Sequence, residues 1–113
     1  MNEPLTEAET LRRQVRRLAR EVARGRVISY GALGARCEPP VSGYVCGRVM
    51  GQLMEDVPWW RVVGKDGKLP IGKRGPEHSL RQRKLLEEEG VEFEDDAIGR
   101  RFFEDEAVQG ELF

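Results

Sequence analysis

The chain has 113 residues, of which 39% are hydrophobic and 35% are charged, so it can build one hydrophobic core and does not have the composition of a disordered protein. It has no apolar run of the ~18 residues that a membrane span needs and no secretion signal at its start, so we expect a cytoplasmic protein that acts as a monomer. Cys37, Cys46 and the single histidine, His78, are not in metal-ligand spacing, and we expect free thiols, no metal and no cofactor.

The net charge of −1 conceals an uneven distribution along the chain. Residues 11–84 contain 17 Lys/Arg and 6 Asp/Glu, whereas residues 85–113 contain 2 Lys/Arg and 11 Asp/Glu. A basic body with an acidic end favours the binding of a polyanion such as nucleic acid. A charge-rich surface that binds no polyanion is the alternative.

The first predicted element is a helix that begins after Thr6 and ends at Gly25. Thr6 and Glu9 form a capping-box pattern, and hydrophobic residues then recur at helical spacing until Val22. The opposite face carries a row of arginines that either contacts phosphates or is simply solvated: Arg12, Arg13, Arg16, Arg17, Arg20 and Arg24.

Two further helices are predicted next, joined by a turn. Ser29 can cap a short helix from Tyr30 to about Arg36, and Ser42 can cap a second from about Gly43 to Glu55. A short helix, a turn and a longer helix indicate a helix-turn-helix, although many small domains contain helical pairs.

The second helix of this pair contains two interior glycines, Gly47 and Gly51, on a face away from its apolar stripe. Each costs ~1 kcal/mol of helix propensity, which is typical of positions where another backbone comes close. That backbone is either a neighbouring helix or a DNA strand, and in the second case Arg48 and Gln52 project beside it.

The stretch Trp59–Val63, WWRVV, is predicted to be a strand, and a Gly-rich turn follows it. A basic loop then leads to a last helix from Pro76 to about Glu89, and "VEF" is a candidate short strand. The acidic tail from Glu94 has apolar residues that either pack back on the domain or form a partner site: Phe102, Phe103, Leu112 and Phe113.

Four motifs together resemble the O6-alkylguanine-DNA alkyltransferases over about residues 8–93. They are "GRVISYGALG", "GRVMGQLM", "VPWWRVV" and "RQRKLLEEEGVEF", in that order. The resemblance is to the alkyltransferase-like branch, in which tryptophan commonly replaces the alkyl-accepting cysteine. It implies an α/β fold, a small winged-helix-like domain with a helix-turn-helix, as in the C-terminal domain of the enzymes. Residues 1–93 would form this DNA-binding domain without the enzymes' N-terminal domain, and residues 94–113 its acidic tail.

The resemblance also implies roles for single residues. Trp59 stands at the position of the alkyl-accepting cysteine and would line a lesion pocket with Arg74 and Tyr30. Tyr30 would also press on the target phosphate. The residues that would contact DNA are Tyr30, Arg48, Gly47, Gly51, Gln52, Ser29 and Lys73, of which Arg48 would fill the gap that a flipped nucleotide leaves.

Behind the pocket, the resemblance implies a supporting group of Trp60, Arg61 and Glu89. Trp60 replaces the histidine of the enzymes' motif, and Glu89 matches the glutamate that binds that histidine. In a strand, neighbouring side chains point in opposite directions, so Trp59 is expected to face the pocket and Trp60 the interior near Glu89. The asparagine hinge of the enzymes has no counterpart, and Asp56 lies nearest to its position.

The two tryptophans remove both groups that alkyl transfer needs. A thiolate and a base are required, whereas an indole offers one N–H donor and no base. The sequence therefore predicts a sensor that is not an enzyme and that flips an O6-alkylguanine in double-stranded DNA. The resemblance further implies that it docks in the minor groove and passes the lesion to nucleotide-excision repair proteins. Two alternatives are a true alkyltransferase that uses Cys46 or Cys37, and a helix-turn-helix regulatory protein with no lesion pocket.

Overall fold

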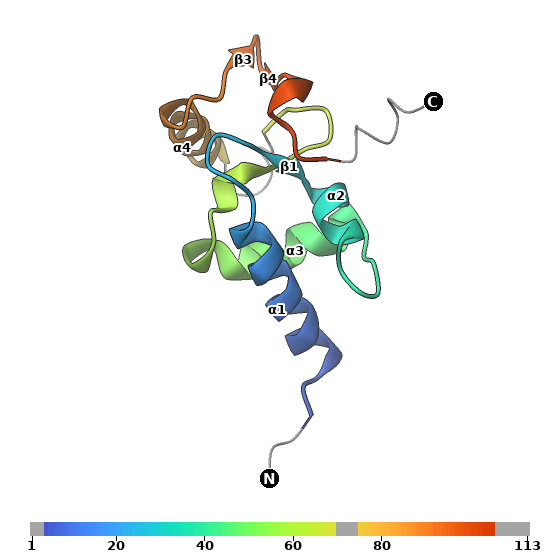
Figure 1. Ribbon diagram of the computed structural model, residues 1–113. Coiled ribbons are helices and arrows are strands. Elements are labelled where there is room, and N and C mark those ends of the chain that lie inside the picture. The colour runs from blue at the N-terminus through green and yellow to red at the C-terminus, as the bar shows by residue number, and fades with distance from the viewer. Residues whose placement is uncertain (1–3, 70–74, 106–113) are drawn as a thin grey trace, which may run out of the picture.

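The computed structural model describes residues 4–69 and 75–105 (Figure 1). Its helices are α1 (Glu7–Arg20), α2 (Tyr30–Ala35), α3 (Gly43–Leu53) and α4 (Gly75–Glu88), with 3-10 turns η1 (Met54–Asp56), η2 (Trp59–Arg61) and η4 (Arg100–Phe102). The strands are β1 (Ile28–Ser29), β2 (Val62–Val63), β3 (Phe93–Glu94) and β4 (Ala97–Ile98). In this described part, no helix combines the length and apolar character of a membrane span.

The start of α1 is confirmed and its predicted end is wrong. Thr6 and Glu9 form the reciprocal capping box, with Glu9 N 3.1 Å from Thr6 Oγ1 and Thr6 N 3.2 Å from Glu9 Oε1. The helix ends at Arg20 instead of running to Gly25. Backbone groups beyond it are bound by side chains from distant segments: Ala23 N–H donates to Glu104, and Gly25 N–H to Glu89. These long-range hydrogen bonds replace the helical ones.

The predicted helix-turn-helix is present as α2 and α3. Ser29 Oγ accepts from Ala32 N–H and Ser42 Oγ accepts from Val45 N–H, each at 3.1 Å, so both predicted N-caps are confirmed. The turn between the helices folds back onto α2, where Val41 N–H donates to the carbonyl of Gly34 at 3.0 Å. This contact sets the angle at which α3 leaves α2.

Replacing Gly34 with alanine is expected to destabilise this turn. An added Cβ would lie 2.5 Å from the Val41 carbonyl oxygen, which is backbone and cannot rotate away. We expect Gly34→Ala to lower the free energy of unfolding by about 1–3 kcal/mol, measured by urea denaturation. Gly31→Ala in the same helix is the control, because a Cβ there meets nothing within 4 Å. Helix propensity favours alanine at both positions, so Gly31→Ala should be neutral or stabilising, and an equal loss in both variants would show that the close approach at Gly34 is not the cause.

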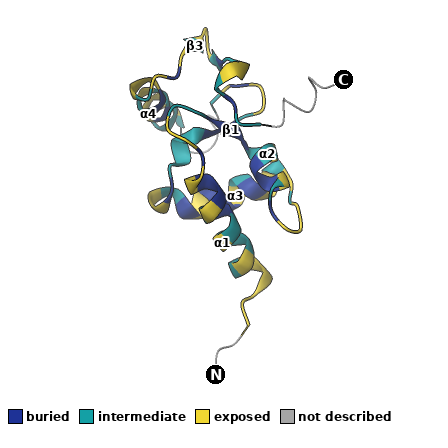
Figure 2. Ribbon diagram, in the orientation of Figure 1, coloured by how far each residue is buried: buried dark blue, intermediate teal, exposed yellow. Residues whose placement is uncertain are grey.

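Two hydrophobic cores lie on opposite sides of the small parallel sheet of β1 and β2 (Figure 2). Ile28 pairs with Val62, and both face the core shared by α1, α2 and α3. Val27 and Val63 face the other core, which α4 and the C-terminal segment close. Because side chains alternate along a strand, two short strands serve both cores.

The predicted strand over Trp59–Val63 is wrong for its first three residues. They form the 3-10 turn η2, and only Val62 and Val63 pair with β1. Pro58 initiates the turn, since its carbonyl accepts from Arg61 N–H at 3.0 Å. Gln82 of α4, which is buried, then donates from Nε2 to the carbonyls of Trp60 and Val62. The carbonyls of Trp60 and Val62 are therefore bound by a side chain of α4 instead of by a neighbouring strand.

The acidic C-terminal segment packs back on the domain as far as it is described. After the β3–β4 hairpin, Phe103 is buried and forms a parallel bridge with Val27. Asp105 accepts hydrogen bonds from Ser29 N and Ser29 Oγ at 2.8 and 2.6 Å. The predicted strand at residues 91–93 is found at Phe93–Glu94. Leu112 and Phe113, also named in the tail, lie outside the described residues.

Candidate nucleic-acid interface

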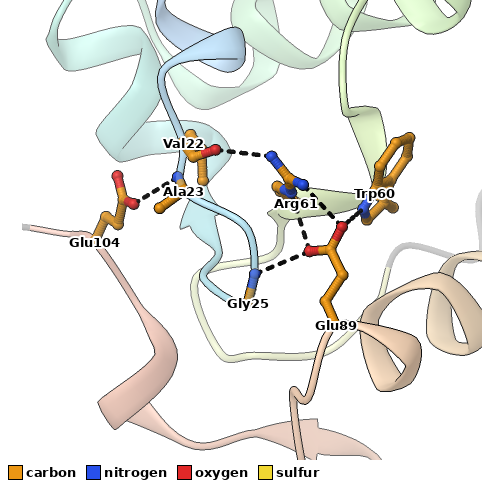
Figure 3. Close-up of polar contacts among 7 residues, drawn as sticks. All are labelled: Val22, Ala23, Gly25, Trp60, Arg61, Glu89 and Glu104. Carbon is orange, nitrogen blue, oxygen red and sulfur yellow. Dashed lines mark hydrogen bonds and ion pairs between the residues drawn. The ribbon is translucent and has the colours of Figure 1, made fainter.

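Glu89, just beyond α4, connects the end of α4 with η2 and with the loop after α1 through one carboxylate (Figure 3). Its oxygens accept from Arg61 Nη2 at 2.8 Å, Arg61 Nε at 3.0 Å, Trp60 Nε1 at 2.8 Å and the Gly25 N–H at 3.0 Å. Arg61 Nη1 also donates to the carbonyl of Val22 at 2.9 Å. The predicted proximity of Trp60 and Glu89 is thus present in the structure, where the indole N–H donates to the carboxylate, and Arg61 binds the same carboxylate.

These contacts change the acidity of Glu89, whose side chain is only 4% exposed. Burial alone would raise the pKa of the carboxyl group. The hydrogen bonds from Arg61, Gly25 and Trp60, together with the charge of Arg61, outweigh burial and hold the pKa below its ordinary value. The carboxylate is therefore the form that this site stabilises.

The lowered pKa predicts that Glu89 makes the fold acid-sensitive. The folded state binds the proton less tightly than the unfolded state, so this stabilisation is present above the unfolded pKa and is lost as pH falls through the folded pKa. We expect the difference in unfolding free energy between the native protein and Glu89→Gln to shrink between neutral and acid pH. Urea midpoints measured for both across that range test this, and a constant difference would contradict it.

Trp59 is stacked on a residue of α4 that the sequence did not assign to the site. The rings of Trp59 and His78 lie 4.5 Å apart at 23°, and Arg81 Cζ lies 6.0 Å from the Trp59 ring. Trp60 meets Trp59 edge-on, at 6.0 Å and 87°. His78 and Arg81 are three residues apart, so they share a helix face, but the sequence does not show that this face meets η2.

A cavity of about 790 Å³ opens beside Trp59. It lies among the end of α1, the segment from η1 to η2, and α4. The described residues that line it are Arg20, Met54, Glu55, Asp56, Val57, Pro58, Trp59, Trp60, Arg61 and Arg81. Its size falls in the range of ~300–1,000 Å³ that holds small organic groups, and its wall combines indole rings with guanidinium groups. Tyr30, which the sequence placed in the same pocket, is not among these lining residues.

The outward side of α3 forms a second part of the candidate site. Cys46, Val49, Met50 and Leu53 are buried, and the opposite side exposes Arg48, Gly51 and Gln52. Gly47 lies against Tyr30, because a Cβ there would be 3.6 Å from Tyr30 Cδ1.

Three further residues were predicted to belong to the site: Ser29, Lys73 and Arg74. Ser29 is 3% exposed, and its side chain is engaged with Ala32 and Asp105, so we do not carry it into the proposed interface. Lys73 and Arg74 lie outside the described residues. Within the described ranges, no group of three His, Cys, Asp or Glu side chains is placed to hold a metal ion.

Neither cysteine has the environment of a nucleophile. Cys46 is completely buried and Cys37 is 1% exposed. Burial raises the pKa of both thiols, and the pKa of Cys46 rises to about 12, with a smaller contribution from Cys37. At neutral pH both cysteines are therefore held as thiols and not as the thiolate that attacks an alkyl group.

Comparisons with known proteins identify the family and the fold. Residues 10–91 match the family described as 6-O-methylguanine DNA methyltransferase, DNA binding domain. The solved structure of S. pombe Atl1 in complex with damaged DNA containing O6-carboxymethylguanine shares 29% sequence identity with this chain, with a TM-score of 0.66 over 78% of this chain and 82% of that one.

A second structure, S. pombe ATL in complex with DNA, has a TM-score of 0.70 at 24% identity over 90% of this chain and 94% of that one, and it supports the fold alone. The comparison with curated protein sequences finds no match. The expected α/β, helix-turn-helix fold is confirmed. Because the family match spans most of the chain, this protein belongs to the 6-O-methylguanine DNA methyltransferase DNA-binding domain family, and its structure is similar to that of S. pombe Atl1.

Proposed function

We propose that this protein recognises O6-alkylguanine in double-stranded DNA, holds the flipped base beside Trp59 and does not remove the alkyl group. The observation that carries the proposal is the pair of adjacent indoles. Trp59 lines the cavity with no nucleophilic atom, and Trp60 already donates its only N–H to Glu89. A flipped base can stack on aromatic rings, whereas neither indole can accept an alkyl group or a proton.

The charge and shape around the cavity support a ligand of this kind. Arg20 and Arg81 line it together with the acidic Glu55 and Asp56, whereas the guanidinium group of Arg61 is already held by Glu89. A nucleotide that rotates out of the duplex brings its phosphate with it, and arginines attract that charge. The similarity to Atl1, whose complex contains O6-carboxymethylguanine DNA, favours an alkylated guanine as the base.

A long-lived, bent complex would be the signal to nucleotide-excision repair proteins, which we propose as the next partners. A sensor without turnover remains on its lesion until displaced, because no covalent step alters the base. The exposed acidic residues of the β3–β4 hairpin, Glu94, Asp95 and Asp96, lie in an element that is away from the helix-turn-helix in the fold (Figure 1). Their charge disfavours contact with phosphates and leaves this side accessible to a protein.

The alternative of a true alkyltransferase conflicts with the burial of both thiols. Cys46 and Cys37 would have to leave the core that surrounds them before a base could reach their sulfurs. Intact-protein mass after incubation with O6-methylguanine DNA tests this alternative directly. An added methyl group on either cysteine would overturn the proposal.

The central experiment compares binding to otherwise identical duplexes with and without O6-methylguanine, at several stated salt concentrations. The sensor proposal predicts tighter binding to the damaged duplex at every salt concentration, because the flipped base adds contacts that do not depend on counterion release. Equal affinity for the two duplexes would instead identify a general helix-turn-helix DNA-binding protein.

Tyr30 provides a prediction that separates a DNA contact from a core position. If its hydroxyl meets a phosphate, Tyr30→Phe weakens damaged-DNA binding by the loss of one hydrogen bond to a charged group, about 1.5–3 kcal/mol. Tyr30→Ala weakens it further, because the ring that covers Gly47 is removed as well. Affinity and melting temperature are measured together. A folded Tyr30→Ala protein with native affinity would remove Tyr30 from the site.

A further inference from the structure

Arg81 of α4 places a positive charge on the wall of the cavity beside Trp59. Its side chain lines the cavity, and its Cζ lies 6.0 Å from the centre of the Trp59 ring. Within residues 4–69 and 75–105 its guanidinium group has no carboxylate partner, and Glu77, four residues earlier, is not paired with it. A guanidinium group is held only weakly over an exposed indole, so this charge is available to a ligand.

Two other charged pairs near the cavity are already neutral. Arg61 is bound by Glu89 at 2.8 Å, and Asp56 is bound by Arg16 at 3.5 Å. Each cation has its anion within contact distance, so neither pair attracts a further ion as strongly as an unpaired charge does.

The remaining charged side chains of the described wall are Arg20, Glu55 and Arg81. Arg20 Nε donates to the carbonyl of Asp56 at 2.9 Å, so Arg20 lies against η1, and Glu55 is part of η1. These two opposite charges therefore belong to the same side of the cavity. Arg81 lies on the α4 side, where none of the described lining residues is acidic. The wall between α4 and Trp59 thus carries an uncompensated positive charge.

His78 holds this part of α4 against Trp59. Its imidazole ring is stacked on the indole, with the ring centres 4.5 Å apart and the planes at 23°. His78 and Arg81 are three residues apart and share one face of the helix. Arg81 is therefore kept within reach of a group that lies at the Trp59 ring.

We propose that the site selects guanines whose O6 substituent carries a carboxylate, and that Arg81 is the residue that makes this selection. The inference rests on the proposed function, in which the flipped base lies beside Trp59. Trp59 stands where the enzymes of the resemblance accept the alkyl group, so the O6 substituent is the part of the base that comes closest to it. A guanidinium group binds a carboxylate through two parallel N–H donors, and the pair is stronger in a partly desolvated cavity than in water.

The test uses duplexes that differ in one base: guanine, O6-methylguanine, O6-carboxymethylguanine and O6-carbamoylmethylguanine. The last has an amide in place of the carboxylate, so it matches the carboxymethyl adduct in size and lacks its charge. At one stated salt concentration, we expect the native protein to bind the carboxymethyl duplex about 10-fold more tightly than the carbamoylmethyl duplex. Arg81→Gln should remove this difference and keep the preference for O6-methylguanine over guanine.

Lys84→Gln is the matched control. Lys84 is exposed on the same helix and is not among the described residues that line the cavity, so the variant loses the same charge away from the site. It should keep the native ratio of the two affinities. Arg81→Glu should reverse the order, because a carboxylate at this position repels the charged adduct. All three variants are expected to melt like the native protein, since both side chains are exposed.

The possible outcomes separate this inference from the proposed function. Equal affinity of the native protein for the carboxymethyl and carbamoylmethyl duplexes, with both bound more tightly than unmodified DNA, would overturn the inference and leave the proposed function intact. A preference that survives in Arg81→Gln would remove Arg81 from the role. An equal loss for all duplexes in Arg81→Gln, with the ratio kept, would identify a phosphate contact instead. If the native protein binds no modified duplex more tightly than the unmodified one, the proposed function fails and this inference fails with it.

Discussion

Replacing Arg61 with methionine is expected to lower the free energy of unfolding by about 3–5 kcal/mol, the usual result of removing one partner of a buried ion pair. The side chains of Arg61 and Glu89 are 14% and 4% exposed, and their closest atoms lie 2.8 Å apart. Without Arg61, the buried carboxylate keeps only the donors from Trp60 and Gly25, and the Val22 carbonyl loses its partner. Urea denaturation at neutral pH measures the loss.

Arg17→Met is the matched control for this prediction. Arg17 forms an ion pair with Glu21 at 3.4 Å, but the two side chains are 59% and 60% exposed, and such pairs contribute at most about 1 kcal/mol. The double variant Arg61→Met/Glu89→Gln should be less damaged than Arg61→Met, because it no longer buries an unpaired charge. Equal, small losses in Arg61→Met and Arg17→Met would show that the Glu89 cluster does not hold the fold together.

Restoring a nucleophile and its base is expected to convert this protein into an alkyl acceptor. Trp59→Cys alone should transfer slowly, since a cysteine of ordinary pKa is only a few per cent thiolate at pH 7. The added change Trp60→His places an imidazole where the indole N–H now lies 2.8 Å from Glu89. Glu89 would orient that imidazole as a base, so the double variant should accept a methyl group faster than the single one. Intact-protein mass after incubation with O6-methylguanine DNA measures the transfer.

The position of His78 adds a control that the sequence did not suggest. His78 is stacked on Trp59, so the single variant Trp59→Cys still has a histidine nearby. The variant Trp59→Cys/His78→Gln has the new thiol but lacks this histidine. The variant Trp59→Ala/Trp60→His has the new imidazole but lacks the thiol, and it is the control for methylation elsewhere in the chain. Rapid, stoichiometric methylation of Trp59→Cys/His78→Gln would show that the site needs no histidine. In that case the indole of Trp60 is not a second block to catalysis.

Local chemistry in the sequence was sufficient to predict where the helices begin. Thr6, Ser29 and Ser42 each accept a backbone N–H within three residues, so their capping role is decided by their immediate neighbours. The family resemblance added the contact between Trp60 and Glu89, which are 29 residues apart. No local pattern could have supplied that pair.

Features that depend on tertiary contacts could not be predicted. The end of α1 is decided by side chains that reach residues 22–25 from much later in the chain. Trp59–Arg61 has the composition of a strand but forms a 3-10 turn after Pro58, and the carbonyl of Trp60 is bound by Gln82 of α4 instead of by a strand. The contacts of His78 and Arg81 with Trp59 are a further example, because they depend on how α4 packs on η2.

The position of residues 102–105 beside β1 affects how the chain folds during its synthesis. The segment 22–29 obtains its hydrogen-bond partners from Arg61, Glu89, Glu104 and Asp105, all of which a ribosome makes later. Contacts between such distant residues slow folding, because the intervening chain must be ordered first. The helix-turn-helix can close its own turn early. A nascent chain that ends at residue 91, the limit of the family match, still lacks the contacts that Phe103 and Asp105 make with Val27 and Ser29, so we expect the domain to reach its full stability only after synthesis has passed residue 105.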